Sequence, residues 1–226
     1  MRAIHGVPPE ILRDQIDAVV EDIGVDAVKI GMLHAPEIVR TVAAAIDRHG
    51  IRNVVLDPVM VATSGASLID SPAIAVLVRE LFHRSAVVTP NLDEASLLVG
   101  RVIDSEASMS EAARELLGMG AGAVLIKGGH LAGDLVSDLL MTASGDIHWM
   151  RAPRIATANT HGTGCTLSSA IAAYLALGAG LLEAVQAARA YVRGALEAGA
   201  KVRTGVGGGP LNHGHAPLSM SLRRLR

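Results

Sequence analysis

Short apolar runs alternate with longer segments of helical periodicity along most of the chain. The apolar runs are rich in Val, Ile and Ala, which is typical of strands buried on both faces. Strands that alternate with helices in this way predict βα units and a mainly parallel sheet. The strands expected from these runs are 26–30, 53–57, 86–89 and 123–127.

The segments between these runs carry helical periodicity and the residues that favour helix ends. Several begin with proline in the first turn, as at Pro9 and Pro36, and Gly50 and Gly100 stand just past two expected ends. Proline at a first turn and glycine after a last turn are both common in helices. The expected helices are 9–23, 36–49, 72–83, 92–99, 110–119, 165–177 and 181–201.

Two further apolar runs, 136–142 and 147–152, are separated by Ala143-Ser144-Gly145-Asp146. A Gly-Asp turn between two strand-like runs predicts a β-hairpin. The stretch 204–218 is rich in glycine and proline, so we expect it to be irregular.

Composition excludes several classes of protein. The chain has 226 residues, half of them apolar, with 2% aromatic residues and a formal net charge of −2. This length predicts one domain over 1–226, with an irregular tail over 214–226. Few aromatic residues and no basic excess argue against nucleic-acid binding. No run reaches the roughly 18 apolar residues of a membrane span, and the single Cys165 excludes a disulfide framework, so we expect a cytoplasmic protein.

The segment 160–169 leads from a polar loop into a helix rich in small residues. Gly162 and Gly164 flank Thr163, which lets the backbone turn tightly and present N–H groups to a ligand. The start of a helix favours anions, and phosphate above all. Cys165 falls in the first turn, where the helix dipole favours a thiolate that could accept a proton from a substrate hydroxyl. It could equally be a small residue packed against the sheet.

The run 160–168, Thr-His-Gly-Thr-Gly-Cys-Thr-Leu-Ser, closely resembles the signature of the hydroxymethylpyrimidine/phosphomethylpyrimidine kinases of thiamine biosynthesis. The resemblance implies a ribokinase-like three-layer α/β/α fold and ATP-dependent phosphorylation of hydroxymethylpyrimidine and its monophosphate. Most ribokinase-like enzymes carry a catalytic Asp where Cys165 stands, whereas the pyrimidine kinases carry Cys. By this match Cys165 is the base, and the backbone N–H groups of Gly162, Thr163, Gly164 and Cys165 form the oxyanion hole.

Polar residues follow three of the expected strands. Asp57 is placed to meet Mg²⁺, although an Asp before Pro is also a common turn former. Asn91 and Glu94 have nearly the spacing of a capping box. Lys127, followed by two glycines, could reach ATP phosphates or be solvated. The resemblance assigns Asp57 and Glu94 to Mg²⁺ and its waters, and Asn91 and Lys127 to the phosphates of ATP.

The same resemblance implies an acceptor pocket. Met32 would cover the pyrimidine ring and Val59 would line the pocket beside it. A polarizable thioether suits a flat heteroaromatic ring, but on spacing alone Met32 would be an ordinary core residue. The glycine-rich run 207–213 is similar to a segment near the family's C-terminus and is expected to border the nucleotide.

Family members carry a further strand and a glycine-rich turn ahead of the point where this sequence opens. We therefore expect part of the acceptor pocket to be missing from this chain. The alternatives are a pyridoxal kinase of the same fold and a shortened, non-catalytic binding remnant. A cysteine-nucleophile hydrolase is disfavoured because no His or Asp partner for Cys165 is identifiable. Unpaired sheet edges are compatible with a homodimer.

Overall fold

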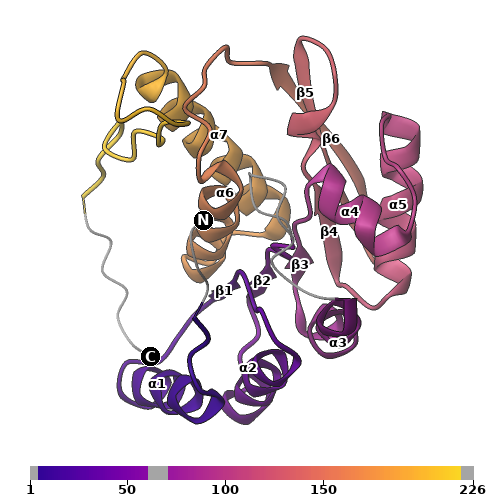
Figure 1. Ribbon diagram of the computed structural model, residues 1–226, viewed down its shortest axis with the longest axis vertical. Helices are drawn as coiled ribbons and strands as arrows, with labels where there is room; N and C mark the ends of the chain where they lie inside the picture. The colour runs from indigo at the N-terminus through magenta and orange to yellow at the C-terminus, as the bar shows by residue number, and fades with distance from the viewer. Residues whose placement is uncertain (1–4, 61–70, 220–226) are drawn as a thin grey trace.

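The computed structural model describes residues 5–60 and 71–219 (Figure 1). In this part of the chain, strands pair into one sheet in sequence order. The first four strands run parallel and the last two are antiparallel to their neighbours. The strands are β1 (Val28–Ile30), β2 (Val54–Leu56), β3 (Val87–Val88), β4 (Ala123–Ile126), β5 (Leu135–Thr142) and β6 (Ile147–Pro153).

One helix precedes the first strand, and the others connect the parallel strands or follow the hairpin. They are α1 (Pro9–Asp22), α2 (Pro36–His49), α3 (Ser71–Leu81), α4 (Leu92–Val99), α5 (Glu106–Gly118), α6 (Thr163–Ala176) and α7 (Leu181–Gly199). Two short 3₁₀ turns, η1 (Phe82–Arg84) and η2 (Gly128–His130), follow α3 and β4. Among the described residues, no helix is both long and apolar enough to cross a bilayer.

The sheet is buried on both faces because its side chains alternate. Val54 and Leu56 of β2 join one apolar cluster, with residues of α2, α3 and α5, whereas Val55 joins a second cluster with α6 and α7. Figure 1 shows these helices on the two sides of the sheet. This period-two alternation produces the three layers that the resemblance implies.

The predicted strands are all present, each within a few residues of its expected ends, and the hairpin over β5 and β6 is confirmed. Helix 36–49 and helix 92–99 have the predicted bounds, and the region 204–218 is irregular as expected. The tail predicted over 214–226 lies partly outside the described residues.

One helix start was predicted wrongly. Helix α5 begins at Glu106 rather than at Ser110. Ser105 caps it: the Ser105 hydroxyl accepts the Ser108 N–H, while the Ser108 hydroxyl accepts the Ser105 N–H. This reciprocal pair satisfies two N–H groups that the first turn would otherwise leave free. The predicted helix 72–83 likewise ends at Leu81 and tightens into η1.

Candidate active site

The carboxyl ends of three neighbouring strands bring polar side chains together. Asp57 directly follows β2, Thr89 follows β3 and Lys127 follows β4. The Thr89 N–H donates to the carbonyl of Leu56 at 2.8 Å, which continues the parallel ladder past the strand ends. Ligands of open α/β sheets bind beyond this edge. A ligand is therefore expected to bind at these strand ends.

Asp57 is the centre of this group, with 1% of its surface exposed. One carboxylate oxygen lies 2.8 Å from Lys127 Nζ and accepts a 3.3 Å hydrogen bond from Thr89 Oγ1. The other accepts from Ser168 Oγ at 3.1 Å and lies 3.8 Å from Lys29 Nζ. A buried carboxylate requires such charged and hydrogen-bonding partners. We call Lys29, Asp57, Thr89, Lys127 and Ser168 the strand-end cluster.

Glu94 is a second buried carboxylate beside the cluster, with 3% of its surface exposed. Its Oε2 accepts the Asn91 N–H at 2.7 Å, and Asn91 Oδ1 accepts the Glu94 N–H at 2.8 Å, so the predicted capping box is formed. Lys127 Nζ lies 3.9 Å from Glu94 Oε2. Burial raises the pKa of Glu94 above its usual range, and the nearby charge of Asp57 adds to the rise, whereas Lys127 opposes it.

The glycine loop enters α6 next to this cluster. Gly162 adopts the left-handed region, with φ of +87°, and α6 begins at the next residue. A side chain at Gly164 would begin 3.2 Å from Lys127 Nζ, so the loop backbone and the ammonium are close neighbours. Ser168 joins the two parts of the site, because its hydroxyl also lies 3.1 Å from the carbonyl oxygens of Gly164 and Cys165.

Cys165 stands in the first turn of α6 and is exposed. The packed alternative from the sequence, a cysteine buried against the sheet, is therefore wrong. Its position one turn before Ser168 places it on the loop side of the strand-end cluster. An exposed thiol at this point is available to a ligand.

The glycine-rich segment near the C-terminus lies against the same loop. The His161 N–H donates to the Gly209 carbonyl at 3.2 Å, and His161 bridges to Pro210 as in a parallel strand pair. A side chain at Gly209 would begin 2.0 Å from Asn159 Oδ1, so only glycine fits there without a shift. Asn159 itself donates to the Gly199 carbonyl at the end of α7. The segment expected to border a nucleotide thus borders the glycine loop.

The residues predicted to bind the acceptor, Met32 and Val59, lie outside the strand-end cluster. Val59 is half-buried, and its N–H donates to the Asp57 carbonyl at 2.8 Å, so it lies in the turn beside the cluster. Met32 is half-buried two residues beyond β1. Neither side chain contributes to the hydrogen bonds or ion pairs of the strand-end cluster.

Sequence reasoning gave no role to Lys29, Thr89 or Ser168. Thr89 was visible as the polar residue that ends an apolar strand, in the same place as Asp57 and Lys127. Ser168 lies one helical turn after Cys165, so helical spacing could have placed it on the same face. Lys29 lies inside a strand, and the sequence carried no comparable signal for it.

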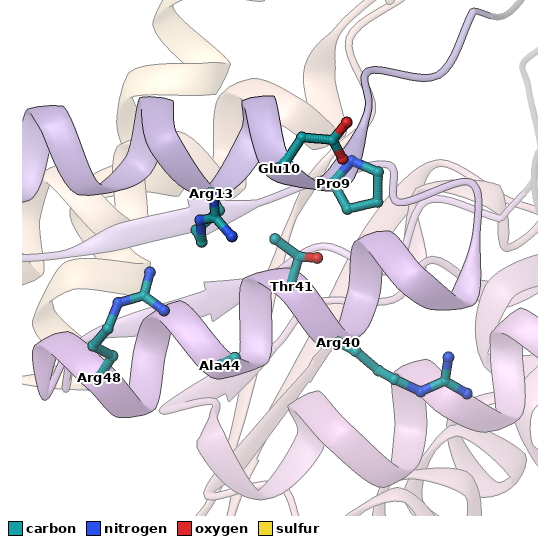
Figure 2. Close-up of a pocket in the computed structure, with 7 residues that line it drawn as sticks. All are labelled: Pro9, Glu10, Arg13, Arg40, Thr41, Ala44 and Arg48. Carbon is teal, nitrogen blue, oxygen red and sulfur yellow. The ribbon is translucent and has the colours of Figure 1, made fainter.

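A surface groove of about 410 Å³ lies elsewhere, between α1 and α2 (Figure 2). Arg13, Arg40 and Arg48 line it. Two of these charges already have partners, since Arg13 pairs with Asp14 at 2.7 Å and Arg48 pairs with Asp17. The groove shares no residue with the strand-end cluster, so we assign it no part in the chemistry.

Comparison with known proteins decides the family. The family model for phosphomethylpyrimidine kinase matches residues 1–212. The chain belongs to this family. It is 48% identical over 214 residues to the hydroxymethylpyrimidine/phosphomethylpyrimidine kinase of Rhizobium meliloti, covering 94% of this chain and 80% of that protein. The resemblance drawn from residues 160–168 is thus confirmed.

Other relatives are longer than this chain or differ in name. The thiamine biosynthesis bifunctional protein ThiED of Geobacter sulfurreducens is 50% identical over 211 residues, which are 93% of this chain but 42% of that protein. An ADP complex of Bacillus subtilis pyridoxal kinase is 32% identical with a TM-score of 0.85, covering 94% of this chain and 79% of the other. The ribokinase-like fold and a phosphotransferase activity are therefore confirmed.

Proposed function

We propose that this chain transfers the γ-phosphoryl group of ATP to the hydroxyl of hydroxymethylpyrimidine and then to the resulting monophosphate, with Mg²⁺. The observation that carries the proposal is the position of Lys127, which lies 2.8 Å from buried Asp57 and against the backbone of Gly164. A cation, two buried carboxylates and an anion-binding helix start are thereby gathered at one edge of the sheet. Phosphoryl transfer requires such positioning and charge neutralisation more than covalent chemistry by the protein.

The nucleotide phosphates would bind between Lys127 and the glycine loop. The ammonium supplies charge, and the N–H groups of Gly162 and Gly164 supply donors where negative charge develops on the transferred group. The Thr163 N–H donates to the Thr160 carbonyl at 3.3 Å, so it would have to leave that acceptor to join them. Asn91 and Lys127 form an isolated parallel bridge, so Asn91 lies at the same edge of the sheet as Lys127. Its side-chain oxygen is used by the cap, which leaves the NH₂ group to donate to a phosphate.

Asp57 and Glu94 fit a magnesium site. Both carboxylates are buried, and burial raises the pKa of Glu94 more than Lys127 lowers it. Mg²⁺ is commonly held by one or two carboxylates together with substrate phosphates. The ion would neutralise charge on the nucleotide, while Asp57 and Glu94 hold it or its waters in place. Lys29 and Lys127 already lie 3.8 Å and 2.8 Å from the Asp57 carboxylate oxygens.

Cys165 would act as the base. The acceptor hydroxyl oxygen forms a bond to the γ-phosphorus as the bond from that phosphorus to the β–γ bridging oxygen breaks, and ADP leaves. The hydroxyl proton passes to Cys165, whose Sγ would accept it as a thiolate at the exposed start of α6. Met32 and Val59 would contact the pyrimidine ring, to which a thioether and an aliphatic side chain offer apolar surface.

Pyridoxal phosphorylation is the second candidate, favoured by the structural likeness to Bacillus subtilis pyridoxal kinase. Both acceptors carry a hydroxymethyl group on a flat nitrogen heterocycle, so the phosphate half of the site cannot distinguish them. The experiment is ADP release with MgATP and, in turn, hydroxymethylpyrimidine, its monophosphate, pyridoxal or no acceptor. We expect release with both pyrimidines to exceed release with pyridoxal. Release with pyridoxal alone would replace the proposal, and nucleotide binding without release would make the chain a binding remnant.

A further inference from the structure

A buried ion pair lies behind the segment that carries Lys127. Asp138 of β5 and Arg189 of α7 are joined by a 2.7 Å contact between Arg189 Nε and Asp138 Oδ2. Their side chains are 10% and 14% exposed. Arg189 Nη2 also donates to the Met150 carbonyl of β6 at 2.9 Å. The pair therefore connects the helix layer formed by α6 and α7 to the antiparallel part of the sheet (Figure 1).

The second oxygen of Asp138 holds the residue that follows Lys127. The Gly128 N–H donates to Asp138 Oδ1 at 2.8 Å. Gly128 is pressed against β5 so closely that a side chain there would begin 1.8 Å from the Ser137 carbonyl oxygen. The backbone at Gly128, directly after Lys127, is thus held by the hydrogen bond to Asp138 and by its contact with Ser137.

The hydrogen bond between Gly128 and Asp138 lies just past the end of the regular β4–β5 ladder. The pairing of β4 with β5 runs from Ala123 to Ile126, whose partner is Leu139. Gly128 lies beyond it, and its N–H finds a carboxylate in place of a strand carbonyl. Buried ion pairs are poor contributors to stability, because desolvation offsets their attraction. The pair at this point is better explained by the backbone that it holds in place.

We propose that Asp138 and Arg189 are positioning residues for the phosphate-binding lysine: Arg189 orients Asp138, Asp138 fixes the Gly128 N–H, and the fixed backbone directs the Lys127 ammonium to Asp57 and the phosphates of ATP. The inference rests on the proposed role of Lys127 in nucleotide binding. Neither residue touches the nucleotide. Their loss should weaken the binding of ATP and leave the binding of the pyrimidine acceptor unchanged.

The experiment compares Arg189→Met with Arg193→Met. Arg193 is the matched control: it lies one turn further along α7 and likewise donates to a β6 carbonyl, that of Pro153 at 2.9 Å, but it pairs with Glu197 instead of Asp138. We expect R189M to raise KM for ATP and the Kd of ATP by about tenfold to a hundredfold, as small misplacements do. KM for the pyrimidine should stay near the wild-type value. R193M should leave all three constants near wild type.

Two further variants separate positioning from folding. Arg189→Lys keeps the charge and should restore most of the ATP affinity lost in R189M. The double variant D138N/R189M removes both charges while leaving an amide oxygen that can accept the Gly128 N–H, so it should fold and bind ATP better than R189M. This double variant keeps the proposal testable where R189M does not fold.

The inference is overturned if R189M binds ATP as wild type does, if R193M weakens ATP binding equally, or if KM for the pyrimidine rises as much as KM for ATP. Equilibrium titration of ATP needs no turnover, so it separates this inference from the proposed function. A wild-type chain that releases no ADP with either pyrimidine refutes the proposed function. A wild-type chain that turns over while R189M retains full ATP affinity refutes the inference alone.

Discussion

Lys127 Nζ lies 2.8 Å from Asp57 Oδ1 although the two residues follow strands that are not neighbours in the sheet. The lysine side chain crosses the end of β3, where Thr89 donates to the same carboxylate oxygen. With 1% of its surface exposed, Asp57 has these charged and hydrogen-bonding partners in place of water. The contact joins two strand ends to which the proposed function gives separate roles, metal binding for Asp57 and phosphate binding for Lys127.

Replacing Asp57 by Asn should abolish most of the activity while preserving the fold. The amide retains an oxygen for Ser168 or Thr89, but it removes one of two carboxylates that would hold the metal. We expect kcat/KM to fall at least about a hundredfold, and the Mg²⁺ concentration for half-maximal rate to rise. Both are measured by titrating Mg²⁺ at fixed ATP. A variant with wild-type Mg²⁺ dependence would remove Asp57 from the metal site.

Replacing Cys165 by Ala should lower turnover and leave nucleotide binding intact. Loss of a general base costs about a hundredfold to ten-thousandfold, whereas the loop N–H groups that would bind phosphate belong to the backbone. Because Cys165 is exposed, its truncation should change the free energy of unfolding by only about 0.5 kcal/mol. Steady-state kcat, the Kd of ATP and urea unfolding test the three statements. Near-normal kcat in C165A would rule out this residue as the base.

Much of the fold is predictable from local pattern, because strands buried on both faces and helices with clear caps leave strong signals. The predicted capping box of Asn91 and Glu94 forms as its spacing indicates. The start of α5 was missed because its cap uses Ser108, not the Glu or Gln of the usual box. The Ser108 hydroxyl accepts the Ser105 N–H, as a longer Glu or Gln side chain does in the usual box.

The site was predictable in part, for a different reason. Asp57 and Lys127 stand directly after strands, where the topology of a parallel sheet collects side chains. Their contact with each other depends on lateral strand order and side-chain reach, which no linear pattern encodes. The same holds for Ser168, whose bond to Asp57 joins residues 111 positions apart.

Glu94 gives the protein a pH-dependent stability of known sign. Its ordinary pKa is 4.5 and burial raises it in the folded state. A raised carboxyl pKa contributes stability below the ordinary value, and this contribution is lost as pH rises through the folded value. In the variant E94Q the side-chain oxygen can still accept the Asn91 N–H. Glutamine does not titrate, so E94Q does not lose this stability as pH rises. In the absence of Mg²⁺, the unfolding free energy of E94Q relative to wild type should therefore increase from pH 4.5 upward.

Urea unfolding at a series of pH values in EDTA measures this difference. Glu183→Gln, at an exposed position in the first turn of α7, controls for removing a carboxylate from the surface. If the difference between E94Q and wild type decreased as pH rises, Glu94 would be stabilised as an anion and the assigned direction of its pKa would be wrong.

Gly128 and Gly129 form a natural pair for testing how tightly the Lys127 segment is packed. A side chain at Gly128 would begin 1.8 Å from the Ser137 carbonyl oxygen, whereas one at Gly129 meets nothing within 4 Å. Gly128→Ala should lower the unfolding free energy by about 1–3 kcal/mol through overpacking, and Gly129→Ala should have a much smaller effect. Equal stabilities in urea unfolding would show that the segment can relax away from β5.

The central claim is that a γ-phosphoryl group moves from ATP to a pyrimidine at the strand-end cluster. Mass spectrometry of a reaction with MgATP and hydroxymethylpyrimidine tests it most directly, because it counts phosphoryl groups on the acceptor. The account predicts the monophosphate and then the diphosphate, with one ADP formed for each phosphoryl group transferred and neither product formed by D57N at a comparable rate. ATP binding with no phosphorylated pyrimidine, or products formed equally well by D57N, would contradict it.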